Sequence, residues 1–116
     1  MPREVAYLIA IEHWCVKLLE YTHDMTEEEL LHDWLKQIAV AKMMELIGES
    51  ARKLPDDLKA KHPEIPWKGM VGMRNILAHL YYEADFEKVW EAVTVHMPRV
   101  LEVVRLYIPP EPTDPL

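Results

Sequence analysis

Apolar residues recur along this chain at intervals of three and four positions, and no stretch alternates between apolar and polar residues as a half-buried strand does. The spacing predicts an all-α fold. We expect a small helical bundle of four main helices, over residues 3–24, 26–53, 67–82 and 86–107.

The segments between these helices contain no repeat and no long linker. Pro55 should end the second helix, and the Pro-Asp-Asp-Leu stretch that it begins could form one short helical turn. We therefore expect one domain over residues 1–108, followed by a flexible Pro-rich tail over residues 109–116.

The first predicted helix is apolar along two neighbouring stripes. They consist of Val5, Leu8, Ile9, Val16 and Leu19, and of Tyr7, Ile11, Trp14, Leu18 and Tyr21. A helix of a four-helix core needs only one such face. We therefore expect the surplus face to pack against a second subunit, so that the protein forms a homodimer. Glu12 falls on the first stripe, and we expect it to pair with a nearby base.

The second predicted helix has a capping box in Thr26 and Glu29 and a glycine, Gly48, deep in its interior. An interior glycine costs about 1 kcal/mol relative to alanine, and the close approach of another backbone would compensate for it. The charged residues at helical spacings around Gly48 predict a solvated face with modest ion pairs: Lys42, Glu45, Glu49, Arg52 and Lys53. A functional role for Glu49 is the less favoured interpretation.

Two further features concern the last helix. Asp85 is placed to cap its start. Pro98 lies in its interior and should kink it, because proline removes a backbone donor and clashes with the preceding turn.

Charge and composition restrict the classes of function. The net charge of -7 argues against strong non-specific nucleic-acid binding, so any RNA contact should be local. The single cysteine, Cys15, excludes an intrachain disulfide and fits a reducing compartment. We see no secretory signal and no uncharged run that could span a bilayer, and we expect a cytoplasmic protein without membrane contact.

The candidate chemistry lies between Met73 and Tyr82, where Arg74, Asn75, His79 and Tyr81 follow each other closely. Asn75 is the only asparagine of the chain. A guanidinium suits phosphate, and an imidazole suits proton transfer near neutral pH. His79 would act as general base on a ribose 2′-hydroxyl, while Arg74 would hold the phosphate. Asn75 would orient the imidazole or donate to a phosphate oxygen.

The geometry of a regular helix complicates this hypothesis, because Arg74 and His79 would lie about 140° apart around its axis. Either the helix ends or distorts near His79, or two copies of the motif meet across a dimer axis. We favour the dimer. By spacing alone, however, an Arg-x4-His pair is more often a pair of ordinary surface residues, and tyrosines beside it are more often packing residues.

The other histidines and the cysteine suggest no rival chemistry. No histidine belongs to a zinc motif of the HExxH type, Cys15 lies among apolar residues, and no glycine-rich phosphate loop exists. We expect neither a metal nor a cofactor.

The segment Arg74-Asn75-Ile76-Leu77-Ala78-His79-Leu80-Tyr81 resembles the R-x4-H-x-Y signature of the HEPN superfamily, in its HepT-like toxin branch. Three flanking features are similar to that branch too: an IGEA-like segment at residues 47–51, Ile-Pro-Trp at residues 65–67, and Asp85 with Trp90. One departure is Leu80, where relatives often have Gly or Glu.

This resemblance implies a dimer whose two motifs line a shared cleft. It implies a metal-independent endoribonuclease, the toxin of a type VII toxin–antitoxin pair, which leaves a 2′,3′-cyclic phosphate on RNA. Arg74 and His79 would be catalytic, with Asn75 in support. The partner would be a MntA-like minimal nucleotidyltransferase, the antitoxin, which adds AMP to Tyr81. The alternatives are a non-catalytic helical module that docks this nucleotidyltransferase and a purely structural dimer, and assembly beyond the dimer stays open.

Overall fold

The computed structural model describes residues 2–110, and over this range the chain forms helices and no strand. The predicted all-α class is therefore confirmed. The long elements are α1 (Arg3–Thr22), α3 (Trp34–Arg52) and α5 (Trp67–His79), with the shorter α2 (Glu27–His32) and α4 (Asp56–Ala60) between them. A 3₁₀ turn, η1 (Tyr81–Glu83), leads to the last rod, which consists of α6 (Phe86–Glu91), a π-helical turn η2 (Ala92–His96) and α7 (Met97–Tyr107).

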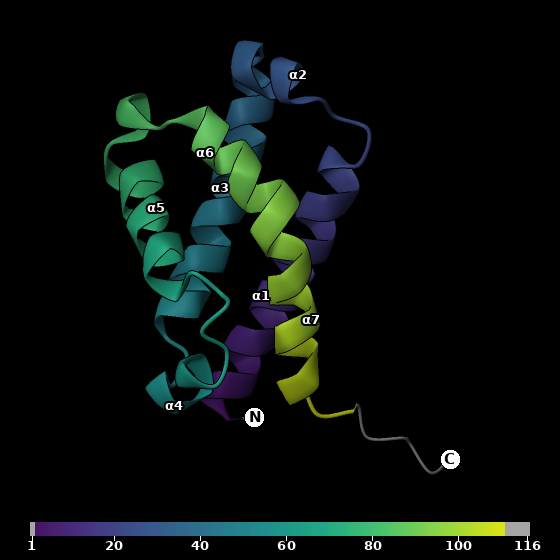
Figure 1. The fold of residues 1–116 in the computed structure, drawn as a ribbon, viewed down its shortest axis with the longest axis vertical. Coiled ribbons are helices and arrows are strands. Elements are labelled where there is room, and N and C mark those ends of the chain that lie inside the picture. The colour runs from purple at the N-terminus through teal and green to yellow at the C-terminus, as the bar shows by residue number, and fades with distance from the viewer. Residues whose placement is uncertain (1, 111–116) are drawn as a thin grey trace.

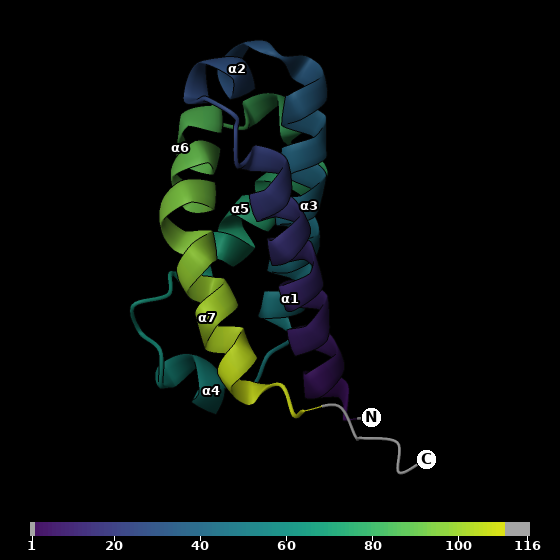
Figure 2. The same ribbon diagram turned by 90° about the vertical axis from the view of Figure 1, so that its right-hand side faces the viewer.

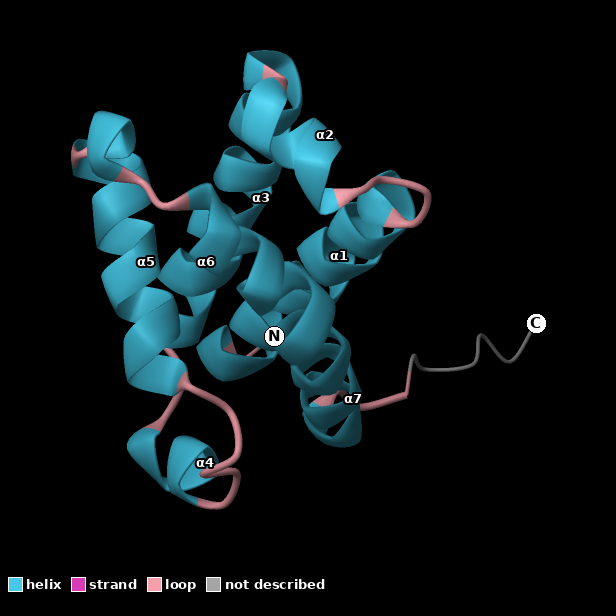
Figure 3. Ribbon diagram, turned by 45° about the horizontal axis from the view of Figure 1, so that its top comes forward, coloured by secondary structure: helices cyan, strands magenta, loops and turns pink. Residues whose placement is uncertain are grey.

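The long helices stand side by side as a bundle. Helix α3 packs against α1 on one flank and α5 on the other, and α7 packs against α1 (Figure 1). Figure 2 shows the rod of α6 and α7 running alongside α1. The loops lie at the two ends of the bundle (Figure 3). The core between the helices is formed mainly by aliphatic, methionine and cysteine side chains, with Trp67 at the start of α5. Ile11, Cys15, Ile47, Val93 and Met97 are among its members.

Helix α1 uses both of its apolar stripes inside the protomer. Its buried line is Leu8, Ile11, Cys15, Leu18 and Thr22, which draws on each of the two stripes. The surplus face expected on α1 is therefore smaller than its sequence suggests. Burial also raises the pKa of the Cys15 thiol to about 12, which keeps it protonated and confirms an inert core residue.

The expected pairing of Glu12 is confirmed. Arg105 in α7 donates from Nε to Oε2 of Glu12 over 3.0 Å, which ties the end of the last rod to α1.

The predicted helix over residues 26–53 is wrong at Asp33, where the chain leaves the helix and starts a new one. The Asp33 carboxylate accepts hydrogen bonds from the backbone N–H groups of Leu35 and Lys36, which makes it the N-cap of α3. Gln37 then donates to the free carbonyls at the end of α2. At the start of α2, Thr26 caps as predicted.

Directly before Pro98, where a kink was predicted, the last rod leaves regular α-helical geometry through a π-helical turn. The N–H of Met97 donates to the carbonyl of Ala92, five residues back, and Pro98 follows directly. This widened turn accommodates the ring that a regular helix would exclude. Asp85 caps α6 as predicted, with its carboxylate accepting from Glu87 and Lys88 N–H groups.

Two further expectations concern the C-terminal tail and the contact with membranes. Residues 111–116 of the expected tail lie outside it. Among the helices of residues 2–110, none is long and apolar enough to cross a membrane.

Candidate functional site

The candidate site lies where α3 and α5 are in contact, and Gly48 makes this close contact possible. A Cβ atom at Gly48 would lie 2.6 Å from Cβ of Arg74 and 3.0 Å from the carbonyl oxygen of Met70. Only a residue without a side chain fits there. The predicted close approach of another backbone is confirmed, and the element that approaches is the helix with the Arg-x4-His motif.

Arg74 spans this contact and is mostly buried, with 23% of its side chain exposed. Its Nη2 lies 2.9 Å from Oε2 of Glu49, and its Nη1 donates to Oδ1 of Asn75 over 2.9 Å. Its Nε is buried without a hydrogen-bond partner. The guanidinium is therefore held on two sides, with donor capacity left over.

Glu49 is the common partner of several cations. Besides Arg74, it contacts Nη2 of Arg52 at 2.9 Å and Nζ of Lys53 at 3.5 Å. The hydrogen bond from Arg52, with the charges of Arg52 and Arg74, lowers the pKa of Glu49 to about 2. The predicted solvated ion pairs exist, as Lys42 and Glu45 show at 3.6 Å, but Glu49 also joins α3 to α5, which its spacing did not predict.

His79 is the last residue of α5, and its side chain is exposed. Leu80, with φ of -133° and ψ of 44°, leaves the helical conformation. Helix α5 includes His79 and ends directly after it, so the end of the helix does not by itself bring Arg74 and His79 together, and the dimer stays a prediction. The predicted helix over residues 67–82 is therefore too long, because Tyr81 and Tyr82 belong to the 3₁₀ turn that follows.

Tyr81 lies against α6 and is partly accessible. Its ring meets that of Phe86 edge-on, with 5.9 Å between centroids, and 37% of the residue is exposed. Partial burial raises the pKa of its phenol above the ordinary value. It borders a cavity of about 270 Å³ shared with Ile38, Ala41, Lys42, Glu45 and Leu77.

Apolar side chains lie exposed beside this site. Trp34, Leu35 and Ile38 at the start of α3 are 70%, 60% and 48% exposed, and Ile76 on α5 is 41% exposed. Exposed apolar side chains therefore lie on α3 and α5 as well as on the last rod, where Val95 and Leu106 are 60% and 68% exposed.

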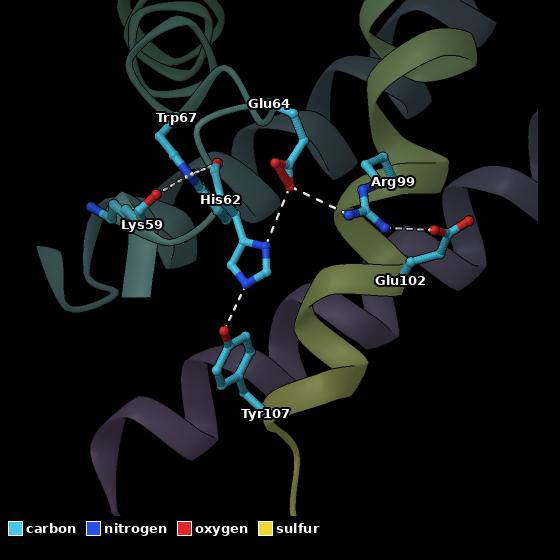
Figure 4. A network of polar contacts seen from close by, with 7 residues as sticks. All are labelled: Lys59, His62, Glu64, Trp67, Arg99, Glu102 and Tyr107. Atoms are coloured by element: carbon cyan, nitrogen blue, oxygen red, sulfur yellow. Dashed lines mark hydrogen bonds and ion pairs between the residues drawn. The ribbon is translucent and has the colours of Figure 1, made fainter. Parts of the chain in front are cut away.

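A second polar group was not predicted, and it lies between the connector before α5 and the end of α7 (Figure 4). His62 is hydrogen-bonded through Nε2 to the Tyr107 hydroxyl at 2.6 Å and through Nδ1 to Oε1 of Glu64 at 3.3 Å. Arg99 connects Glu64, at 3.5 Å, with Glu102, at 2.9 Å. No local pattern could have signalled it, since His62 and Tyr107 are 45 positions apart.

The described part of the chain contains no group of three or more His, Cys, Asp or Glu residues placed to hold a metal ion. Arg74 contacts both Glu49 and Asn75, while His79 and Tyr81 lie at and just beyond the end of the same helix.

Comparison with known proteins adds independent information. The family described as "Ribonuclease HepT-like" matches residues 11–106. A candidate RNase of Methanocaldococcus jannaschii is 35% identical over 99 residues, covering 85% of this chain and 82% of the relative. The probable ribonuclease HepT of Thermococcus cleftensis is 39% identical over 79 residues, covering 68% and 72%. A candidate RNase of Caldanaerobacter subterraneus is 30% identical over 99 residues, covering 85% and 88%. No solved structure gives a significant match.

Proposed function

The chain belongs to the HepT-like ribonuclease family, and we propose that it is a metal-independent endoribonuclease toxin whose reaction depends on Arg74 and His79. The resemblance drawn from the R-x4-H-x-Y motif is thereby confirmed at the level of the family. The observation that carries the proposal is the end of α5. There an exposed imidazole follows, five residues on, a guanidinium that Glu49 and Asn75 hold in place.

The reaction needs only the RNA and these side chains. His79 takes the proton of a ribose 2′-hydroxyl, and the oxygen attacks the adjacent phosphorus. The bond to the 5′-oxygen breaks, this oxygen takes up a proton from solvent and leaves as a hydroxyl group, and a 2′,3′-cyclic phosphate remains. Arg74 binds the non-bridging oxygens and stabilises the extra negative charge of the transition state.

Asn75 supports Arg74 in this proposal. Its Oδ1 accepts a hydrogen bond from Nη1 of Arg74, which restricts the guanidinium and leaves the amide NH₂ free to donate to a phosphate oxygen. Of the two roles expected for Asn75, this contact favours phosphate binding over orientation of the imidazole.

We further propose that two copies of the chain form the active unit. An isologous dimer would bring two motifs to one cleft and double their positive charge. The exposed Trp34, Leu35, Ile38 and Ile76 beside the motif favour a protein contact at this end of the bundle. Light scattering at micromolar concentration should give the mass of a dimer, and a monomer would contradict the shared cleft.

The proposed regulation acts through Tyr81. A MntA-like minimal nucleotidyltransferase, the antitoxin, would add AMP to its hydroxyl. The residue is partly exposed and lies two positions after His79, so an added AMP would bring bulk and negative charge to the end of α5. RNA phosphates would then be repelled from the site.

The test is cleavage of RNA in EDTA by the wild type and by His79→Ala, with the 3′ ends of the products mapped. We expect cyclic-phosphate ends from the wild type and a loss of at least about a hundredfold in rate for His79→Ala. His32→Ala is the matched control, because His32 is also exposed at the end of a helix and pairs only with Glu28 at 3.3 Å.

Mass spectrometry of the same samples separates the remaining outcomes. Equal cleavage by both variants would refute the role of His79. No cleavage by an unmodified wild-type dimer would refute the enzyme and favour the module that docks a nucleotidyltransferase. If Tyr81 carried AMP, inactivity would instead support neutralisation at that residue.

A further inference from the structure

The charges of this acidic protein are unevenly distributed along the chain. Residues 42–74 contain seven Lys or Arg and five Asp or Glu, whereas the remaining positions contain six and fifteen. The part over residues 42–74 comprises the second half of α3, most of α5 and, between them, α4, in which Asp56 and Asp57 accompany Lys59.

Within this part, three cations contact one carboxylate, and a fourth contacts the backbone beside it. Arg52, Lys53 and Arg74 all contact Glu49, at 2.9, 3.5 and 2.9 Å. Lys59 of α4 donates from Nζ to the backbone carbonyl of Arg52 over 3.3 Å. We call these five residues the Glu49 cluster.

The Glu49 cluster extends away from His79 along the bundle. Arg74 precedes His79 by five residues, about 7.5 Å of helix rise. Arg52 and Lys53 lie at the end of α3, and Lys59 lies in α4, beneath the start of α5 in Figure 1. A negatively charged strand that reaches His79 and Arg74 would meet these cations next if it continued toward α4.

Structural roles account for only part of this charge. Glu49 can neutralise one cation, and the end of α3 favours positive charge by about 0.3–1 kcal/mol through its dipole. The side chains of Arg52 and Lys53 nevertheless stay 50% and 40% exposed. The cluster thus keeps a surplus of positive charge on an accessible surface.

We propose that Arg52, Lys53 and Lys59 form a phosphate-binding subsite, which holds the RNA strand next to the phosphate bound by Arg74. This inference rests on the proposed ribonuclease function and deepens it. The local surplus explains how an enzyme with a net charge of -7 binds a polyanion. Because phosphates carry no base information, the subsite adds affinity and position without sequence preference.

The test measures binding of a short single-stranded oligoribonucleotide to the His79→Ala protein, which does not cleave it. The double variant Arg52→Gln/Lys59→Ala is compared with Lys17→Ala/Lys88→Ala, which removes the same charge at exposed positions outside residues 42–74. We expect the cluster variant to bind about tenfold more weakly and its log-affinity against log-salt slope to fall by about 0.7 per lost phosphate contact. The control pair should keep both slope and affinity.

Cleavage kinetics with His79 present provide a second readout. The cluster variant should raise KM with kcat nearly unchanged, because it removes binding shared by ground and transition states. Equal slopes and affinities for the two double variants would overturn the subsite. If circular dichroism shows that Arg52→Gln/Lys59→Ala is unfolded, Lys53→Gln/Lys59→Ala takes its place under the same criteria.

The subsite and the proposed function can fail separately. Cleavage by the wild type, with no difference between the double variants, would remove only the subsite. Cluster-dependent binding without any cleavage would retain an RNA-binding surface and remove the ribonuclease.

Discussion

The Glu49 cluster and the group around His62 both join distant parts of the chain, and they differ in charge balance. In the His62 group, Arg99 lies between the carboxylates of Glu64 and Glu102, and His62 has a partner on each ring nitrogen. In the Glu49 cluster, one carboxylate serves three cations, and Nε of Arg74 is buried without a partner.

This difference in charge balance suggests a structural role for the His62 group and a ligand-binding role for the Glu49 cluster. A polar group whose donors and acceptors are all satisfied stabilises the fold and has little left to offer a ligand. A group with more cations than carboxylates on an accessible surface can bind an anion, which offsets the repulsion between its positive charges. We therefore expect changes in the His62 group to alter stability, and changes in the Glu49 cluster to alter RNA binding as well.

The largest effect on stability is expected at Gly48, the residue before Glu49, where α3 and α5 come into contact. Gly48→Ala would place Cβ 2.6 Å from Cβ of Arg74 and push α5 away from α3. We expect the free energy of unfolding to fall by about 1–3 kcal/mol, as in other overpacked sites. Urea denaturation measures this change.

Gly72→Ala is the matched control for that substitution. It lies on the same contact-forming helix α5, but a Cβ there would meet no atom within 4 Å. Its stability should rise by up to about 1 kcal/mol, because alanine favours the helix. Equal effects of the two substitutions would contradict the close approach at Gly48.

A smaller effect is expected in the His62 group. Tyr107→Phe removes the hydroxyl that is hydrogen-bonded to Nε2 of His62, a side chain that is only 13% exposed. We expect a loss of about 1–2 kcal/mol in the free energy of unfolding, with RNA cleavage within twofold of the wild type.

Tyr82→Phe serves as the control, because Tyr82 is 82% exposed. Thermal denaturation should show no loss of stability for this variant. If Tyr107→Phe instead abolished cleavage in a stable protein, the separation between the two polar groups would be wrong.

The smallest effect concerns the pH dependence of stability. The pKa of Glu49 is lowered from 4.5 to about 2 in the folded protein, mainly by its hydrogen bond with Arg52. The stabilisation of the folded state by the ionised Glu49 is therefore complete above about pH 4.5, and it is lost as the pH falls toward 2. Glu49→Gln should be less stable than the wild type at pH 7, and the two should converge across this window. A difference that does not change with pH would show that the charge of Glu49 is not what stabilises the contact.

Helix caps were predictable because their signals are local. Thr26 and Asp85 each bond to N–H groups two or three residues ahead, so sequence alone identifies them. The break at Asp33 carries the same signal, but the apolar period continues across it and hid the boundary. The end of α5 at His79 had no proline or glycine to mark it.

The amino-acid sequence was enough to predict the helical class, most caps and a disturbed helix near Pro98. It also gave the order of Arg74, Asn75, His79 and Tyr81 along the chain. These features depend on residues within about one or two helical turns of each other, and periodicity records them.

The contacts of Glu49 with Arg74 and of His62 with Tyr107 were visible only in the folded protein. The same holds for the residues of α1 that are buried, which come from both of its apolar stripes. A hydrogen bond requires two atoms within about 3 Å, and for residues far apart in sequence that distance is set by how the helices pack. The motif was therefore readable along the chain, whereas the charge that surrounds it emerged only when α3, α4 and α5 came together.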